Sequence, residues 1–385
     1  MRVGVFLFGG VEMDTIGAGP PAPTERRYGA DQTWQATERV LDMGVVAETA
    51  NYEFFMFTEH HFMHEGYEVI PNPMLFGSVL AERTERIHIG ALFNIVPQWH
   101  PLRFAEDFAS LVNLSKGRAI LGVGRGSVQR ESIPLGSTIA SAEDPKGRSE
   151  ADRQNRELFG EALEIIRLAL DNETFAYHGE HFVLPQPGIP DRGKMVETLT
   201  LVPRPLYPYE IWQAVSSPPT LEYVPRQGWG GVFAHTHHLL IDKSWSRFAE
   251  IYEETHGVAL APGEKRMLVV DTFVADSHEE AMAGARPSHD EYIKFLLPYG
   301  WLARGYRDSA GNPYPDGFTP TLEDSIEQRW CMVGTAEAVA EGIANRIDAL
   351  GGVEDLAIMP ICLGASYDLY EQQIMRFAKE VRPLL

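Results

Sequence analysis

The sequence predicts an eight-stranded (β/α) barrel, a TIM barrel of the α/β class, with insertions at the carboxyl-terminal face of its strands. Apolar runs of strand length alternate with segments of helical periodicity, polar residues follow the apolar runs, and eight such strands can be counted. Alternating strands and helices form parallel sheets with right-handed crossovers, and closure of eight strands is the simplest arrangement. An open doubly wound sheet is the alternative.

The amino-terminal half alternates without interruption. Val40, Met43 and Ala47 recur at helical spacing, and Pro73 and Pro101 each open a further helix, since proline at the first helical position needs no amide hydrogen. The strands predicted around these helices are residues 3–8, 54–58, 87–95 and 118–123. The Gly- and Pro-rich residues 9–30 form a long loop, for which a substrate lid and a merely loose segment are equally open readings.

The carboxyl-terminal half continues the pattern with two excursions. Residues 175–209 are rich in Pro and Gly and are predicted to wrap the surface, whereas residues 277–330 break the rhythm and predict an insertion over the barrel mouth. The remaining strands are predicted at residues 211–215, 231–234, 266–275 and 355–363, and helices at 152–170, 244–256, 335–350 and around 374–381. We expect a single domain over residues 1–385.

Composition and charge limit the possible partners. Lys and Arg total 33 against 54 Asp and Glu, and the net charge of −21 argues against binding nucleic acid or an anionic membrane. We therefore expect a small-molecule partner. Only Cys331 and Cys362 are present, which argues against a disulfide scaffold and suits a reducing compartment. Without a signal-peptide pattern or an apolar run of about 18 residues, we expect a cytoplasmic protein.

Polar residues that follow the strands should meet at one face of the barrel. Arg125, with glycines on both sides, and the Ser216, Ser217 and Thr220 turn suit a phosphate, and Arg153 or Arg156 would add a second cation. Taken singly, each of these residues is more often a surface ion pair or a helix cap. The other residues expected at this face are His60, His61, Phe93, Asn94, His235, His237 and His238.

A metal site is a weaker reading of the same face. His60, His61 and His64 lie close together in the sequence, and His235 with His237 forms an H-x-H pair. Zinc needs three or four convergent ligands, and the first strand, where such a pair is typical in barrel hydrolases, has no histidine. A buried His60 that only satisfies hydrogen bonds is the structural alternative. The chain contains no Gly-x-Ser-x-Gly elbow and no Walker loop, which argues against serine hydrolases and nucleotide kinases.

The motifs along residues 3–126 resemble those of the bacterial luciferase family of flavin-dependent monooxygenases. Their order and spacing match, and weaker similarities continue at residues 177–182, at the Ser216 turn and at residues 333–335. The motifs that carry the resemblance are Thr58-Glu59-His60-His61-Phe62, Pro71-Asn72-Pro73, His100-Pro101, Ser115-Lys116-Gly117-Arg118 and Gly122 to Gly126.

The resemblance implies a homodimeric barrel that binds reduced FMN, supplied by a separate flavin reductase, and uses O2 to oxygenate a small apolar organic substrate by hydroxylation or Baeyer-Villiger insertion. By position, His60 is the catalytic residue at the flavin edge, and Glu59 would orient it. Leu92-Phe93 falls where the family often has a non-prolyl cis peptide beneath the flavin ring, beside Asn94. The residues implied for the phosphate are Arg125, Arg156 or Arg153, Ser216, Ser217 and Thr220.

One departure concerns the reactive cysteine of luciferases, whose position is Gly124 here. It argues against light emission and against a long-chain aldehyde as substrate. His60, with a reference pKa near neutrality, is expected to exchange a proton during oxygenation. An apolar pocket closed by residues 9–30 and 277–330 would exclude water. Its expected lining is Phe6, Phe8, Met56, Phe93 and Trp99.

Three rival functions remain open. Relatives in the same superfamily use the deazaflavin F420 for hydride transfer without oxygen. A metal-dependent barrel hydrolase and a flavin-binding protein without turnover are more remote. The sequence does not identify the substrate.

Overall fold

Eight parallel strands close into a barrel in the computed structural model, which describes residues 1–137, 149–299, 305–308, 311–315 and 317–385. Each strand pairs with the next, and the last pairs with the first. The barrel prediction is therefore confirmed, and the open-sheet alternative is wrong. In barrel order the strands are β1 (Arg2–Phe6), β2 (Phe54–Phe57), β3 (His88–Ala91), β5 (Ala119–Gly124), β10 (Glu210–Ala214), β11 (Gly230–Phe233), β12 (Arg266–Val274) and β14 (Asp355–Pro360).

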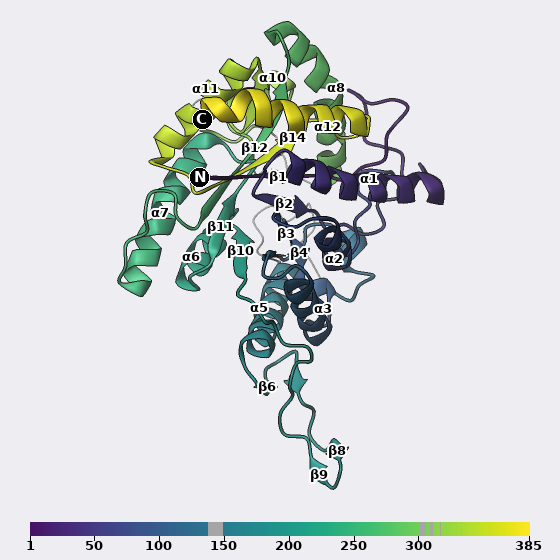
Figure 1. Cartoon of the computed structure of the whole chain (residues 1–385), viewed down its shortest axis with the longest axis vertical. Coiled ribbons are helices and arrows are strands. Elements are labelled where there is room, and N and C mark those ends of the chain that lie inside the picture. The colour runs from purple at the N-terminus through teal and green to yellow at the C-terminus, as the bar shows by residue number, and fades with distance from the viewer. Residues whose placement is uncertain (138–148, 300–304, 309–310, 316) are drawn as a thin grey trace.

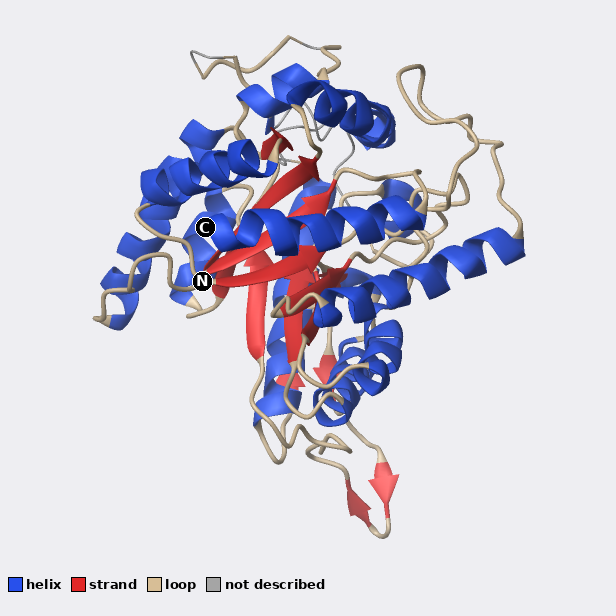
Figure 2. Cartoon of the chain, turned by 45° about the horizontal axis from the view of Figure 1, so that its top comes forward, coloured by secondary structure: helices blue, strands red, loops and turns tan. Residues whose placement is uncertain are grey.

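Helices surround the barrel on its outer side (Figures 1 and 2). Their starts follow capping rules: the Asn72 side chain accepts from the Leu75 amide, and Thr335 accepts from Ala338. Apolar residues between strands and helices form the larger core, while a second cluster fills the barrel interior. The outer helices are α1 (Ala30–Thr49), α2 (Pro73–Arg83), α3 (Pro101–Leu114), α5 (Glu150–Asp171), α6 (Pro218–Arg226), α7 (His238–His256), α11 (Ala336–Leu350) and α12 (Tyr367–Arg376).

Four elements differ from the sequence-based expectation. Helix α7 begins at His238 rather than Ser244, because His237 caps it by accepting from the Leu239 amide. The segment after β12 contains a long helix, α8 (His278–Leu296), and a short one, α10 (Leu322–Glu327). An extra strand, β13 (Cys331–Gly334), pairs with the carboxyl-terminal half of β12.

Smaller elements extend the barrel at its edges. Near the mouth lie β4 (Asn94–Ile95), η1 (Val96–Gln98), α4 (Gln129–Ser132) and η2 (Leu297–Tyr299). The region expected to wrap the surface instead forms two hairpins that project from the barrel at the lower end of Figure 1. Their strands are β6 (Tyr177–His178), β7 (Val183–Leu184), β8 (Pro190–Asp191) and β9 (Lys194–Met195).

A charged cluster closes the amino-terminal end of the barrel. Arg2 donates through Nε to Asp355 Oδ1 at 2.6 Å and through Nη1 to Glu210 Oε1 at 2.8 Å. It thereby joins β1, β10 and β14. None of the described helices has the length and apolar character that a bilayer crossing requires.

Candidate active site

His60 lies at the carboxyl-terminal side of β2, at the barrel mouth. Its Nδ1 is 2.9 Å from Oε1 of Glu131 on α4; the Glu131 side chain is buried, and the His60 side chain is 11% exposed. The Phe8 ring stacks on the imidazole at 6.4 Å, and the Phe295 ring meets it edge-on at 5.9 Å. The mouth therefore places a hydrogen-bonded histidine within an aromatic wall.

Neighbouring carboxylates determine the charge of His60. Burial lowers the pKa of His60, but Glu131, and more weakly Glu68 and Glu59, raise it to about 9 overall. At neutral pH the side chain is therefore an imidazolium. Proton exchange by His60 during oxygenation stays a prediction.

Among the described residues no hydrogen bond joins Glu59 to His60, and Glu59 holds the segment after β3. Its Oε1 accepts from the Trp99 indole at 2.8 Å and lies 3.1 Å from His61 Nε2, while its Oε2 accepts from the Ile95 amide at 2.9 Å. The carboxylate is buried, so the expected catalytic role of Glu59 becomes a positioning role for β4 and η1. Trp99 packs against Phe104 in the outer core, which corrects its expected place in the pocket.

A second buried carboxyl group, Glu68, was not predicted. Its Oε2 accepts from the Thr58 hydroxyl at 2.6 Å and from the Gly9 amide at 3.2 Å. Its Oε1 is buried and has no hydrogen-bond partner among the described residues. Burial raises the pKa of Glu68 to about 7, although His60 and the Thr58 and Gly9 hydrogen bonds oppose the shift. Glu68 can thus hold a proton near neutral pH.

The Leu92-Phe93 peptide bond is cis, as the family resemblance implied. Just after it, Asn94 donates through Nδ2 to the carbonyl of Gly122 at 2.8 Å. The Asn94 Oδ1 is buried without a partner in the part of the chain that the structure describes. A Cβ at Gly124 would lie 3.0 Å from Cβ of Phe93, so a cysteine there would press on the cis segment.

The residues expected to bind phosphate fall into two groups. Arg125 Nη1 lies 3.1 Å from Asp152 Oδ1 and 3.2 Å from Asn155 Oδ1, and Arg156 also contacts Asp152. Arg153 instead pairs with Glu150 and Glu157 at the surface, so Arg156 is the member of the pair that adjoins Arg125.

The second group lies at the start of α6. The Ser217 amide donates to Thr220 Oγ1 at 3.1 Å, and the two side chains also hydrogen-bond. Strand register pairs Gln213 of β10 with Val123 of β5, so the turn after β10, including Ser216, lies on the same side of the mouth as Arg125. No contact between the two groups is recorded among the described residues.

A third polar cluster faces the mouth from β11, β12 and α8. His235 Nε2 is 3.0 Å from Asp271 Oδ1, and its Nδ1 is 3.5 Å from the Tyr292 hydroxyl. Tyr292 also meets the Phe8 ring edge-on at 5.5 Å. The sequence pointed to His235 but not to Asp271 or Tyr292, which lie far from it in the chain. Within the described ranges, no group of three or more His, Cys, Asp or Glu side chains is arranged to hold a metal ion.

The apolar lining is largely as expected. Phe6, Phe8 and Met56 belong to the interior cluster, and Phe93 packs against it. Loop 9–30 is tied over this region: Glu291 of α8 accepts from the Tyr67 hydroxyl at 2.9 Å and from the Gly17 amide at 3.2 Å, and it lies 3.9 Å from Arg26. The loop is therefore held against α8 by these contacts.

A closed (β/α)8 barrel with charged and aromatic groups gathered at the carboxyl ends of its strands has the architecture of a barrel enzyme. A family model described as luciferase-like monooxygenase matches residues 1–352. The chain belongs to this family and is therefore an oxidoreductase.

Three relatives illustrate the range of the family. The 4-hydroxyprotoasukamycin monooxygenase of Streptomyces nodosus subsp. asukaensis is 26% identical over 357 residues, covering 90% of this chain and 86% of the relative. The solved structure of the oxygenating constituent of 3,6-diketocamphane monooxygenase from Pseudomonas putida, in complex with FMN, has a TM-score of 0.72 at 21% identity and covers 96% and 99%. An F420-dependent glucose-6-phosphate dehydrogenase of Microbacterium testaceum is 30% identical over 173 residues, 44% and 48% of the chains.

Proposed function

We propose that the protein is a flavin-dependent monooxygenase that takes reduced FMN from a separate flavin reductase and uses O2 to oxygenate a small apolar organic substrate, by hydroxylation or Baeyer-Villiger insertion. The observation that carries the proposal is the buried His60-Glu131 pair, which lies 2.9 Å apart within a wall of Phe8 and Phe295. A protonated donor in an apolar pocket suits oxygen transfer that must exclude water.

The chemistry of the mouth supports reduced FMN as the cofactor. Oδ1 of Asn94, a buried acceptor without a partner among the described residues, suits an N–H of the flavin ring. Arg125 and Arg156, with the Ser216, Ser217 and Thr220 turn, would hold the phosphate. When bound, reduced flavin supplies the electrons that activate O2.

The chain's own residues position protons and keep water out. As an imidazolium, His60 donates through Nδ1 to Glu131 and keeps a second N–H at Nε2. Phe6, Phe8 and Phe295 line the surroundings with apolar surface. We propose that residues 277–330, through α8, and loop 9–30 cover the mouth within one domain of 1–385. A cytoplasmic homodimer completes the proposal, and sedimentation of the purified chain tests its oligomeric state.

The second candidate function is F420-dependent hydride transfer. The F420-dependent relative, at 30% identity over part of the chain, favours keeping it. Both cofactors carry a phosphate that the Arg125 corner would suit. Only the oxygen-dependent reaction calls for the water-excluding aromatic wall around His60.

Anaerobic titration separates these functions. We expect the purified chain to bind reduced FMN more tightly than reduced F420, and to consume O2 when the reduced FMN complex is mixed with aerated buffer. Preference for F420 would replace the monooxygenase by a hydride-transfer enzyme. Stoichiometric zinc uptake without flavin binding would favour the metal-dependent hydrolase.

Two variants divide the binding and catalytic roles. Arg125→Gln is expected to weaken reduced FMN binding about tenfold or more, since a charge-assisted hydrogen bond is lost. Arg153→Gln on the same helix as Arg156 serves as the control, because its ion pairs lie at the surface.

His60→Ala should slow product formation while leaving FMN affinity within a few-fold. Unchanged oxygenation by His60→Ala would remove His60 from the mechanism.

A further inference from the structure

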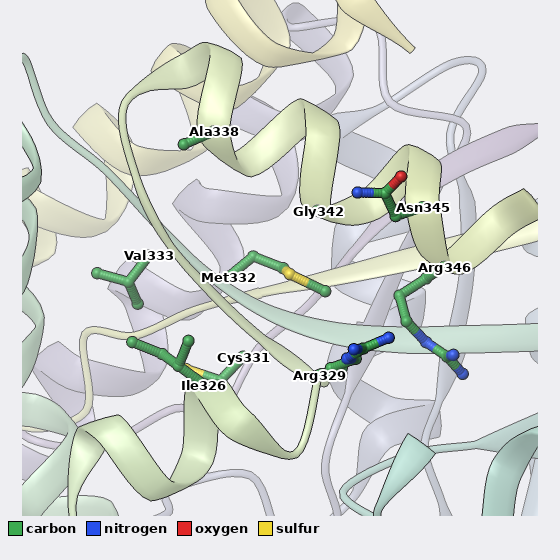
Figure 3. Close-up of a pocket in the computed structure, with 9 residues that line it drawn as sticks. All are labelled: Ile326, Arg329, Cys331, Met332, Val333, Ala338, Gly342, Asn345 and Arg346. Atoms are coloured by element: carbon green, nitrogen blue, oxygen red, sulfur yellow. The ribbon is translucent and has the colours of Figure 1, made fainter. Parts of the chain in front are cut away.

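A pocket of about 590 Å³ lies between β13, α10 and α11 (Figure 3). A smaller cavity of about 290 Å³ shares Ile326 and Arg329 with it and extends to His237 and His238. Ligand sites in proteins have volumes of this order, with mostly apolar walls and a few polar groups. The main lining residues are Ile326, Arg329, Met332, Gly342, Asn345 and Arg346.

Two features of this cavity reduce the stability of the fold. Gly342 lies in the interior of α11, where glycine is less favourable than alanine. A Cβ there would come 2.8 Å from Sδ of Met332, so the glycine lets the Met332 side chain pack closely against α11 in the wall of the pocket. Arg329 has φ of +62°, a left-handed conformation that is uncommon outside glycine. Unfavourable local structure gathered at one place is typical of a functional site.

The polar end of the cavity has unused hydrogen-bonding capacity. Arg346 is 2% exposed and donates through Nη2 to Asp242 at 2.6 Å. Its Nη1 is buried without a partner within the described ranges, as is Nδ1 of His238. No hydrogen bond or ion pair is recorded for the Arg329 guanidinium in the described part of the chain. The cavity thus has two arginine donors at one end and an apolar wall beside them.

Charge balance indicates how many negative charges the cavity would accept. Asp242 already compensates Arg346, and Glu327 borders the smaller cavity near Arg329. The pKa of His238 is lowered to about 4, first by burial and then by its cationic neighbours, so this imidazole is neutral at pH 7. Each negative charge on a ligand adds to the charges of Asp242 and Glu327, so a monoanion that meets two arginine donors is favoured over a dianion.

We propose that this cavity binds a small organic monocarboxylate, with its carboxylate on Arg346 and Arg329 and its apolar body against Ile326, Met332 and Gly342. A guanidinium presents a fork of N–H donors that matches a carboxylate. The apolar body would lie against the surface that Met332 and Gly342 form together. The site is independent of the flavin site, because it shares none of the residues assigned to FMN.

Calorimetric titration of the full chain with hexanoate tests the proposal. We expect saturable binding to one site, and binding at least about tenfold weaker for 1-hexanol, which lacks the charge, and for inorganic phosphate, which lacks the apolar body. Equal affinity for hexanol, or the absence of saturable hexanoate binding, would overturn the proposal.

Variants locate the binding. Gly342→Leu fills the cavity and should abolish hexanoate binding, while thermal unfolding confirms that the helix still folds. Arg329→Gln should weaken binding about tenfold without removing a buried charge. Arg247→Gln on α7 and Arg125→Gln at the flavin site are the controls and should leave hexanoate affinity unchanged. Wild-type affinity in a folded Gly342→Leu variant would place the bound hexanoate elsewhere and refute the site.

Discussion

His60 and Glu68 lie in the same pocket, and their surroundings raise the pKa of both side chains. The two shifts determine which of them carries a proton at neutral pH. His60 is raised to about 9 chiefly by the Glu131 carboxylate against its own burial, and Glu68 is raised to about 7 by burial. Near neutral pH the histidine is therefore charged while the carboxyl group is close to half protonated. This pairing supplies one fixed cation and one exchangeable proton beside the same aromatic wall.

We predict that Glu131→Gln lowers the pKa of His60, because it removes the largest influence that raises it. If the protonated imidazole is required, activity in the wild type declines as pH rises through about 9. In the variant this decline should begin at lower pH. The pH profile of substrate-dependent oxygen consumption measures the shift.

Glu38→Gln changes an exposed residue of α1 and serves as the control. Its activity should decline at the same pH as that of the wild type. An unchanged alkaline limb in a folded Glu131→Gln variant would contradict the role of the His60-Glu131 pair.

Glu68 is predicted to make stability depend on pH. Its folded pKa of about 7 lies above the ordinary 4.5, so the folded state holds a proton that the unfolded chain has released. The stabilisation from this group is full below about pH 4.5 and is lost as pH rises through 7. Glu68→Gln should remove this dependence, which amounts to about 3 kcal/mol at most. Urea unfolding at pH 4.5 and 8 measures it, and parallel wild-type and variant curves would refute it.

The residues that the sequence identified follow barrel strands directly, as His60, Asn94 and Arg125 do. Strand ends converge by geometry, so no knowledge of packing is needed. The misassigned role of Glu59 has a simple cause: successive side chains of an extended segment point to opposite faces, so Glu59 turns toward β4 while His60 turns inward. Glu131 and Asp271 were missed because their contacts with histidines join distant parts of the chain.

At the scale of elements, the first part of the predicted insertion 277–330 forms a regular helix, α8. The sequence did not indicate a helix there, since Pro287 lies inside it. The helix nevertheless begins with a cap in which Ser277 accepts from the Glu280 amide, and Glu279 and Glu280 lie in its favourable first turn. Those local signals were present, but residues 277–330 were interpreted as a whole, as an insertion that breaks the rhythm of strands and helices.

We predict that Glu291→Gln loosens loop 9–30. The buried carboxylate joins Tyr67, the Gly17 amide and Lys294, and removing its charge weakens these contacts. Trypsin should then cut after Arg26 or Arg27 about tenfold faster than in the wild type, since cleavage follows the open population.

Glu279→Gln, at the exposed start of the same helix, is the matched control for the proteolysis assay. Equal cleavage rates for the wild type, Glu291→Gln and Glu279→Gln would show that other contacts hold the loop.

At the scale of the whole molecule, Arg2 of the first strand joins three strands at the base of the barrel through its ion pairs with Asp355 and Glu210. We predict that Arg2→Met destabilises the protein by about 3 kcal/mol, because buried Asp355 loses its partner. Arg153→Met removes only surface pairs and should change the free energy of unfolding by less than about 0.5 kcal/mol. Urea unfolding compares the two, and equal effects would mean that the base contributes little.

The overall architecture was the most predictable level, because the eight-fold alternation of strands and helices leaves few ways to close a sheet. The projecting hairpins were not predicted, because strands of two residues carry too little periodicity to be distinguished from loop. Strand β13 was not predicted either, because it lies at the end of the segment interpreted as an insertion.

The pairing of β1 with β14 also determines where the chain can be extended. Met1 adjoins the base cluster of Arg2, and near the other terminus Arg382 donates to the carbonyl of Asn51, just ahead of β2. Both ends therefore lie on the side of the barrel opposite the mouth (Figure 1). An affinity tag or a surface tether attached at either end would leave the entrance clear, which makes the protein suitable for immobilisation.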